Sequence, residues 1–257
     1  MKIASKKYLI VNADDFGQSA GINRGIIRAH EYGIVTSASL MVRWPAAAEA
    51  AAYGRRRPDL SLGLHLDLGE WTFRGGSWVP LYEVTSLDDL ESVRSEVAGQ
   101  LAAFRRLTGK DPSHLDSHQH VHQREAVQSV VLEWAEKLGA SLRHFCRHVS
   151  YCGDFYGQTA EGSPIPGRIS VNGLIQIVAR LSPGWTELSC HPGVAADLDT
   201  LYREERAQEL NVLCNPRVRA AMRGMGVELC SFENVPSPRW KHWGWKANRI
   251  RDLIHGS

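Results

Sequence analysis

The chain has 257 residues, of which 43% are hydrophobic and 23% charged, as in ordinary globular proteins, and its formal net charge of +2 is too small to argue for a nucleic-acid or membrane partner. Its five cysteines form no Cys-x-x-Cys pair, which argues against a disulfide framework and for a reducing compartment. No stretch approaches the roughly 20 apolar residues of a membrane span, and the first apolar run ends at Asp14, too early for a signal peptide, so a cytoplasmic protein is expected.

The first predicted element is a buried strand over residues 8–11, Tyr-Leu-Ile-Val. Asp14 and Asp15 follow it, and Ser19 stands at the expected N-cap of a helix. The two carboxylates therefore lie at the C-terminal end of a strand, the edge at which α/β folds bind ligands. Adjacent carboxylates repel each other unless a cation or a proton lies between them. The alternative is an Asx-type turn that carries two acids by chance.

Strands and helices alternate along the rest of the chain without a break in composition or an internal repeat. Strands are predicted over residues 35–42, 60–66, 114–118, 142–147, 186–190 and 227–232, and helices over 45–57, 87–107, 127–138, 171–181, 201–214 and from 216. Residues 86–89 (SLDD) resemble a capping box, and 67–85 and 150–167 are expected to be irregular loops. This order predicts one α/β domain over residues 1–236 with a mainly parallel sheet. About seven strands can be identified, so an incomplete or deformed (β/α) barrel is favoured.

Residues 237–257 combine three tryptophans, Trp240, Trp243 and Trp245, with several basic side chains. Such a segment could contact a sugar, a lipid headgroup or nucleic acid. We favour the alternative, a C-terminal helix that docks on the barrel, because aromatic helix faces commonly pack inward. Outside this tail the sequence has no sustained basic stripe, so no nucleic-acid partner is expected.

Histidines stand at the ends of several predicted strands. His65 and His191 each stand alone, and a lone histidine is more often structural than catalytic. The segment 114–122 (HLDSHQHVH) differs, because four histidines and Asp116 share one alternating register. Imidazoles near a carboxylate are typical of a site for zinc or a related divalent ion. The spacing leaves open which of them bind.

The candidate polar residues also occupy equivalent positions in their predicted strands. Each group falls at the C-terminal end of a different predicted strand: Asp14 and Asp15, His65, Asp116 with His118, and His191. Catalytic groups in barrels are gathered in this way, whereas a purely structural explanation needs four independent coincidences. The sequence therefore predicts one shared site.

Five segments in this order resemble the YdjC-type carbohydrate deacetylases, whose best-known members remove an acetyl group from chitooligosaccharides. They are residues 11–17 (VNADDFG), 33–37 (GIVTS), 63–66 (GLHL), 114–118 (HLDSH) with Val121 and His122, and 190–192 (CHP). The resemblance extends over residues 7 to 235. It implies a barrel of the polysaccharide-deacetylase kind that holds one divalent metal ion.

The resemblance also implies roles for five residues: the metal ligands Asp15, His65 and His118, the general base Asp14 and the general acid His191. Family members have been associated with magnesium and with zinc-like ions, so both stay open. Asp116 is expected to orient a ligand imidazole. Two features depart from the family. Gln119 stands where many relatives have another histidine, and the tryptophan-rich tail has no counterpart.

These residues suit the hydrolysis of an N-acetyl amide to a free amine and acetate. A metal held by one carboxylate and two imidazoles keeps positions open for water and the acetyl oxygen, while a base and an acid move the protons. Trp71, Trp78 and Tyr156 lie in the predicted loops and would suit stacking on a sugar ring. The expected partner is an N-acetylated amino sugar, either free or linked to a lipid or an antibiotic, and the basic tail would favour a linked one.

Other functions stay open. The same residues would serve a metal-dependent hydrolase of another amide or ester. A non-catalytic sugar-binding barrel is a further alternative, although a binding protein needs neither a base nor an acid. The sequence is compatible with a homo-oligomer and does not fix the number of subunits.

Overall fold

The computed structural model describes residues 6–159, 161–194 and 202–236. Eight strands form one sheet: β1 (Lys7–Phe16), β2 (Ser37–Leu40), β3 (Ser61–Leu66), β6 (His114–Ser117), β7 (Ser141–Leu142), β8 (Val149–Cys152), β9 (Gly184–Cys190) and β10 (Val227–Cys230). The main path runs β7-β6-β3-β2-β1-β9-β8, with β10 also paired to β1. All of these pairings are parallel. The sheet begins at β7 and ends at β8, so the expected incomplete barrel is confirmed.

Strand β1 is the centre of the sheet. Strand β9 pairs with it from Lys7 to Ala13, while β10 and β2 divide its other edge between its N-terminal and C-terminal halves. From Leu9 to Phe16 every residue of β1 is buried, as the continuous apolar run of a strand covered on both faces predicts. The residues that end β1 therefore lie deep in the fold.

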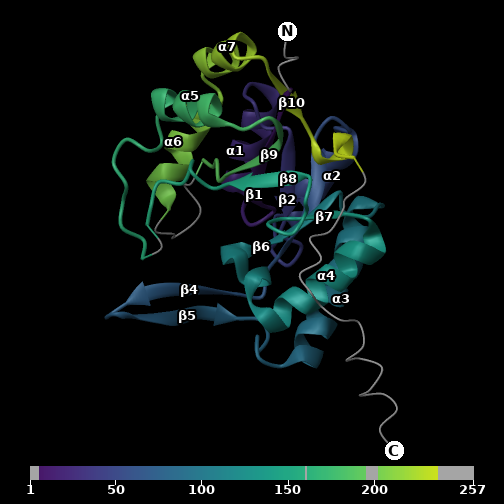
Figure 1. Cartoon of the computed structure of the whole chain (residues 1–257). Coiled ribbons are helices and arrows are strands. Elements are labelled where there is room, and N and C mark those ends of the chain that lie inside the picture. Colours follow the sequence, from purple (N-terminus) through teal and green to yellow (C-terminus); the bar gives the residue numbers. More distant parts are fainter. Residues whose placement is uncertain (1–5, 160, 195–201, 237–257) are drawn as a thin grey trace, which may run out of the picture.

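Helices cover the outside of the sheet (Figure 1). They are α1 (Ala20–Glu31), α2 (Ala47–Arg56), α3 (Leu90–Thr108), α4 (Glu125–Leu138), α5 (Val171–Arg180), α6 (Arg203–Leu213) and α7 (Pro216–Gly224). Their apolar stripes face inward, and α3 buries Val93, Val97, Leu101 and Phe104 at helical spacing. Among the helices in the described ranges, none is long and apolar enough to span a membrane.

The beginnings of two helices test the predicted caps. Ser19 caps α1 by accepting a hydrogen bond from the backbone N–H of Ile22. The predicted capping box at residues 86–89 is wrong, because α3 begins after Asp89. The Asp89 carboxylate accepts from the N–H groups of Glu91 and Ser92, and it thereby takes the role expected of Ser86.

Three segments differ from the sequence-based expectation. Residues 67–85, expected to be irregular, contain the antiparallel hairpin β4 (Gly69–Arg74) and β5 (Ser77–Glu83), which projects from the body (Figure 1). Gly75 and Gly76 both have positive φ, as a tight two-residue hairpin turn requires. The strand expected over 142–147 is only the two-residue β7, and β8 overlaps the start of the loop expected over 150–167. The tail over 237–257 lies outside the described residues.

Candidate functional site

A β-bulge at the end of β1 brings two adjacent carboxylates to one site. In a regular strand neighbouring side chains point to opposite faces. Here the pairing of β1 with β2 shifts register between Ala13 and Phe16, and Asp15 has a left-handed backbone with φ of 66°. A bulge re-aims a side chain in this way. Asp14 and Asp15 therefore both contribute to the site, with different partners.

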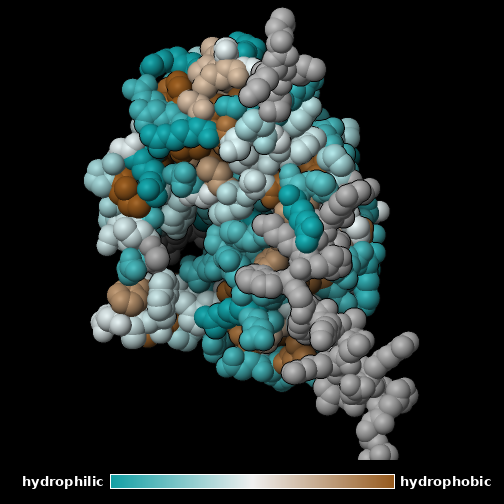
Figure 2. Space-filling view, viewed as in Figure 1, coloured by the Kyte–Doolittle hydropathy of each residue, from teal (hydrophilic) through white to brown (hydrophobic). Residues whose placement is uncertain are grey.

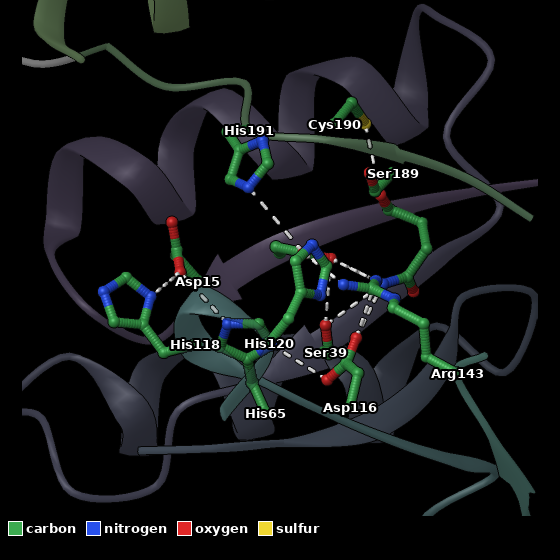
Figure 3. Close-up of polar contacts among 12 residues, drawn as sticks. Asp15, Ser39, His65, Asp116, His118, His120, Arg143, Ser189, Cys190 and His191 are labelled. Atoms are coloured by element: carbon green, nitrogen blue, oxygen red, sulfur yellow. Dashed lines mark hydrogen bonds and ion pairs between the residues drawn. The ribbon is translucent and has the colours of Figure 1, made fainter. Parts of the chain in front are cut away.

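Asp15 lies between two imidazoles. Its Oδ1 is 3.3 Å from Nε2 of His65 on β3 and 3.3 Å from Nδ1 of His118, which follows β6 (Figure 3). Its Oδ2 is 2.6 Å from the Arg206 guanidinium of α6. Oδ1 is buried and has no hydrogen-bond partner among the residues that the structure describes. An orphaned carboxylate oxygen between two imidazole nitrogens fits a divalent metal ion.

The Asp116 carboxylate fixes the orientation of the His65 ring. Its Nδ1 is 2.8 Å from Oδ1 of Asp116, the residue paired with it across β3 and β6, so Nε2 is directed at Asp15. Metal-binding histidines commonly have their second nitrogen held by a carboxylate in this way. His118 is the first residue of a turn over His118–Gln123, and its Nε2 lies 3.6 Å from the Glu70 carboxylate of the hairpin.

The carboxylates around His65 and His118 stabilise positive charge on the two imidazoles. Burial alone would raise the pKa of Asp15, but Arg206, His118 and His65 hold it well below its ordinary value. Burial would lower the pKa of both histidines. The neighbouring carboxylates, chiefly Asp116 for His65 and Asp15 for His118, instead raise the pKa to about 10 and about 9 respectively. A metal ion at this position would compete with protons for the two imidazoles.

Asp14 is held by a buried arginine. Arg143, just after β7, donates to both oxygens of Asp14 at 2.7 and 2.8 Å, and Asn12 donates to Oδ1 at 2.9 Å. Burial would raise the pKa of Asp14, but Arg143 lowers it, so Asp14 is a carboxylate at neutral pH. Arg143 also contacts the carboxylates of Asp116 at 2.8 Å and Glu187 at 2.6 Å. One guanidinium thus compensates three buried acids.

His191 follows β9 and faces Asp14. Its Nε2 lies 3.7 Å from Oδ2 of Asp14, and its backbone N–H donates to the buried Glu209 of α6. Burial lowers the pKa of His191 to about 4, so the imidazole is neutral in the free protein. The Tyr156 ring packs edge-on against it, with centroids 5.2 Å apart.

A cavity of about 690 Å³ joins these groups. Figure 2 shows the hollow opening beside the β4–β5 hairpin. Strand-end side chains line its floor, and Trp71 and Trp78 of the hairpin and Tyr156 line its walls. The volume is in the range of small-ligand sites, and aromatic walls suit the apolar face of a sugar ring.

The structure thus brings together the five residues to which sequence analysis gave direct roles, Asp14, Asp15, His65, His118 and His191, beside the three aromatic residues. Segment 114–122 does not keep one register, because the strand ends at Ser117 and Gln119 and His120 are left-handed. His114 lies outside the site, stacked on Phe232. Sequence analysis missed Arg143 and Arg206, although Arg143 does follow a strand end like the other site residues.

Comparison with known proteins gives a consistent family. A family model described as YdjC-like protein matches residues 8–224. A chitooligosaccharide deacetylase from Serratia marcescens is 31% identical over 90% of this chain and 100% of its own length. A carbohydrate deacetylase from Geobacillus stearothermophilus is 34% identical over 88% of this chain and 97% of its own. A family 4 carbohydrate esterase from Streptomyces lividans shares the fold, with a TM-score of 0.53 at 16% identity over 91% of this chain and 97% of that one.

Proposed function

The chain belongs to the YdjC-like family, and from that premise we propose that it is a carbohydrate deacetylase that removes the N-acetyl group from an amino sugar. The reaction gives the free amine and acetate. One observation carries the proposal. At the floor of a cavity of sugar size, an orphaned carboxylate oxygen lies between two imidazoles and next to a second carboxylate and a third imidazole.

Asp15, His65 and His118 would hold one divalent ion. The ion would polarise the acetyl carbonyl and activate a water molecule. Asp15 Oδ1 is the available oxygen, since Arg206 occupies Oδ2. Asp116 fixes the His65 ring so that Nε2 faces this oxygen. Two imidazoles and one carboxylate suit zinc and related ions better than magnesium, which prefers oxygen ligands.

Asp14 acts as the general base. It is ionised and lies next in the chain to the metal ligand, and the Arg143 guanidinium fixes the plane of its carboxylate. A carboxylate so held can take a proton from water without changing its orientation. Its Oδ2 faces His191, which offers a route for the proton to the other side of the substrate.

His191 protonates the departing amine. Because its imidazole is neutral in the free protein, it must gain a proton before it can donate one. Asp14, 3.7 Å away, would supply that proton after attack by water. The backbone hydrogen bond to Glu209 and the Tyr156 ring fix the position of His191.

Acetate release tests the proposal. The protein would be stripped of metal, reloaded with zinc, magnesium, manganese or cobalt, and assayed on short chitooligosaccharides and an N-acetylglucosamine glycolipid. We expect metal-dependent release from at least one substrate. An ion bound at the site without release from any substrate would direct the search to another amide or ester. A chain that binds no ion would overturn the proposed mechanism.

A further inference from the structure

A second group of histidines lies beside the site but takes no part in the proposed reaction. His120 and His122 lie on the turn after β6, and His144 follows β7. The three imidazoles can each direct one nitrogen so that these atoms lie within 4.8 Å of one another. Their ring centroids are 5.2 to 6.0 Å apart. We call these residues the histidine cluster.

Two of the rings are each held through one nitrogen. Nδ1 of His122 is 2.6 Å from Oγ of Ser117, and Nε2 of His120 is 3.2 Å from the Tyr151 hydroxyl. The remaining nitrogens, Nε2 of His122 and Nδ1 of His120, are buried and have no hydrogen-bond partner in the described part of the chain. In a metal-binding histidine, one ring nitrogen is commonly fixed by a hydrogen bond while the other binds the metal.

The backbone of the cluster is strained. His120 and His144 have left-handed φ values of 54° and 69°, and Gln119 next to His120 has 49°. Such conformations cost free energy in residues other than glycine and persist where the surroundings impose them. Unpartnered polar atoms at a buried site add a further cost. A ligand that engages the nitrogens would compensate for both.

A neighbouring group shows the contrast. Asp14, His65 and Asp116 also offer atoms close enough for an ion. There, however, Arg143 and Asn12 already satisfy the carboxylates, and Asp116 binds the His65 ring. That group has its cation built in, whereas Nδ1 of His120 and Nε2 of His122 have no hydrogen-bond partner in the described part of the chain.

We propose that His120, His122 and His144 bind a second divalent transition-metal ion, separate from the ion at Asp15. Three imidazoles without a carboxylate suit zinc, copper or nickel and disfavour magnesium and calcium. The ion would join the turn that carries His118 to the segment that carries Arg143. It would thereby position one proposed ligand of the first metal and the partner of the general base.

Zinc content of purified, reloaded protein tests this inference. We expect two ions per chain in the wild type and one in each of His122→Gln, His144→Gln and His65→Gln. The double variant His65→Gln/His122→Gln should hold none. His148→Gln, on the same segment after β7 but outside the cluster, is the matched control and should hold two. Magnesium should not replace the ion of the cluster.

The design separates this inference from the proposed function. One ion in the wild type that is lost in His122→Gln but kept in His65→Gln would support the cluster and count against the Asp15 site. Unchanged zinc content in both His122→Gln and His144→Gln would overturn the inference. If His122→Gln or His144→Gln does not fold, the wild type and His65→Gln decide. A wild type that binds one ion, together with a His65→Gln variant that binds none, would also overturn the inference.

Discussion

The floor and the hairpin wall of the cavity are built in opposite ways. On the floor, Asp14, Asp116 and Arg143 are at most 4% exposed and hold one another by charged hydrogen bonds. On the wall, Trp78 is 52% exposed, and it contacts the ring of Phe73 at the outer part of the hairpin. Buried parallel strands thus fix the positions of the proposed catalytic groups, while the proposed sugar-stacking ring Trp78 lies on a projecting antiparallel pair.

The two regions meet at one turn. The Gln119 side chain accepts from the backbone N–H of Trp71 at 2.9 Å and donates to its carbonyl at 2.8 Å. Next to it, His118 faces both Asp15 and Glu70. Gln119 thus attaches the base of the hairpin to the proposed metal site. The following predictions test how far floor and wall are independent.

The largest effect is expected at the floor for Asp15→Asn. Asparagine tolerates the left-handed backbone, so the change removes the charge with little strain. We expect loss of the metal ion and a fall in kcat/KM of about 10⁴-fold, since the ion supplies several kcal/mol of transition-state stabilisation. Metal analysis and acetate release measure both. Normal metal content with normal activity would remove Asp15 from the site.

Asp14→Asn should separate chemistry from metal binding. The general base would be lost, with a fall in kcat of about 10³-fold. Metal content should stay at the wild-type level, because the Asp14 oxygens contact Arg143 and not the ligand histidines. A variant that loses its metal would make Asp14 a ligand and contradict its role as the base.

Arg143→Met should destabilise the floor and leave the wall as the control. It leaves three buried carboxylates without their common cation, which is expected to lower the free energy of unfolding by about 3–5 kcal/mol. The matched change Arg74→Met, at an exposed position of the hairpin, should alter it by less than about 0.5 kcal/mol. Urea unfolding of metal-free protein measures both, and equal effects would contradict the comparison.

Acid should destabilise the main sheet, which carries the floor, before the hairpin, because the hairpin contains no histidine. Burial lowers the pKa of His114 to about 4, so between pH 6.5 and 4 the unfolded chain binds a proton that the folded chain does not. The free energy of unfolding should therefore fall as pH falls through this range. His114→Leu should remove about 3 kcal/mol of that fall. An unchanged pH slope in this variant would show that His114 is protonated in the fold.

The smallest effect is expected at the wall for Trp78→Ala. Loss of one stacking ring should raise KM for chitooligosaccharides by about tenfold and leave kcat and stability near the wild type. Phe73→Ala is the control, because Phe73 contacts Trp78 but does not line the cavity. A lower kcat in Trp78→Ala would mean that wall and floor are coupled.

The sequence predicted which polar residues lie together better than it predicted the segments around them. Asp15, His65 and His118 could be found because each carries a chemically distinctive side chain at a strand end. Arg143 could not, because it follows a strand of two residues and a single arginine carries no pattern. The left-handed turn at Gln119 and His120 comes from tertiary packing, which spacing does not encode.

The segments around the site were predicted incorrectly, for a different reason in each case. Gly75 and Gly76 were a readable hairpin signal, but the polar and aromatic residues around them do not alternate cleanly. Strand β8 has only four residues, of which only Val149 is buried, so its pattern resembles a loop. Asp89 and not Ser86 is the N-cap of α3, and its carboxylate accepts two backbone hydrogen bonds.

Gly69 and Glu83 are directly paired at the base of the β4–β5 hairpin, so the chain leaves the barrel and returns to it at a single point. An insertion or deletion between these residues changes the length of the arm without shifting any strand of the main sheet. Evolution, or a protein engineer, can therefore exchange this arm as a module.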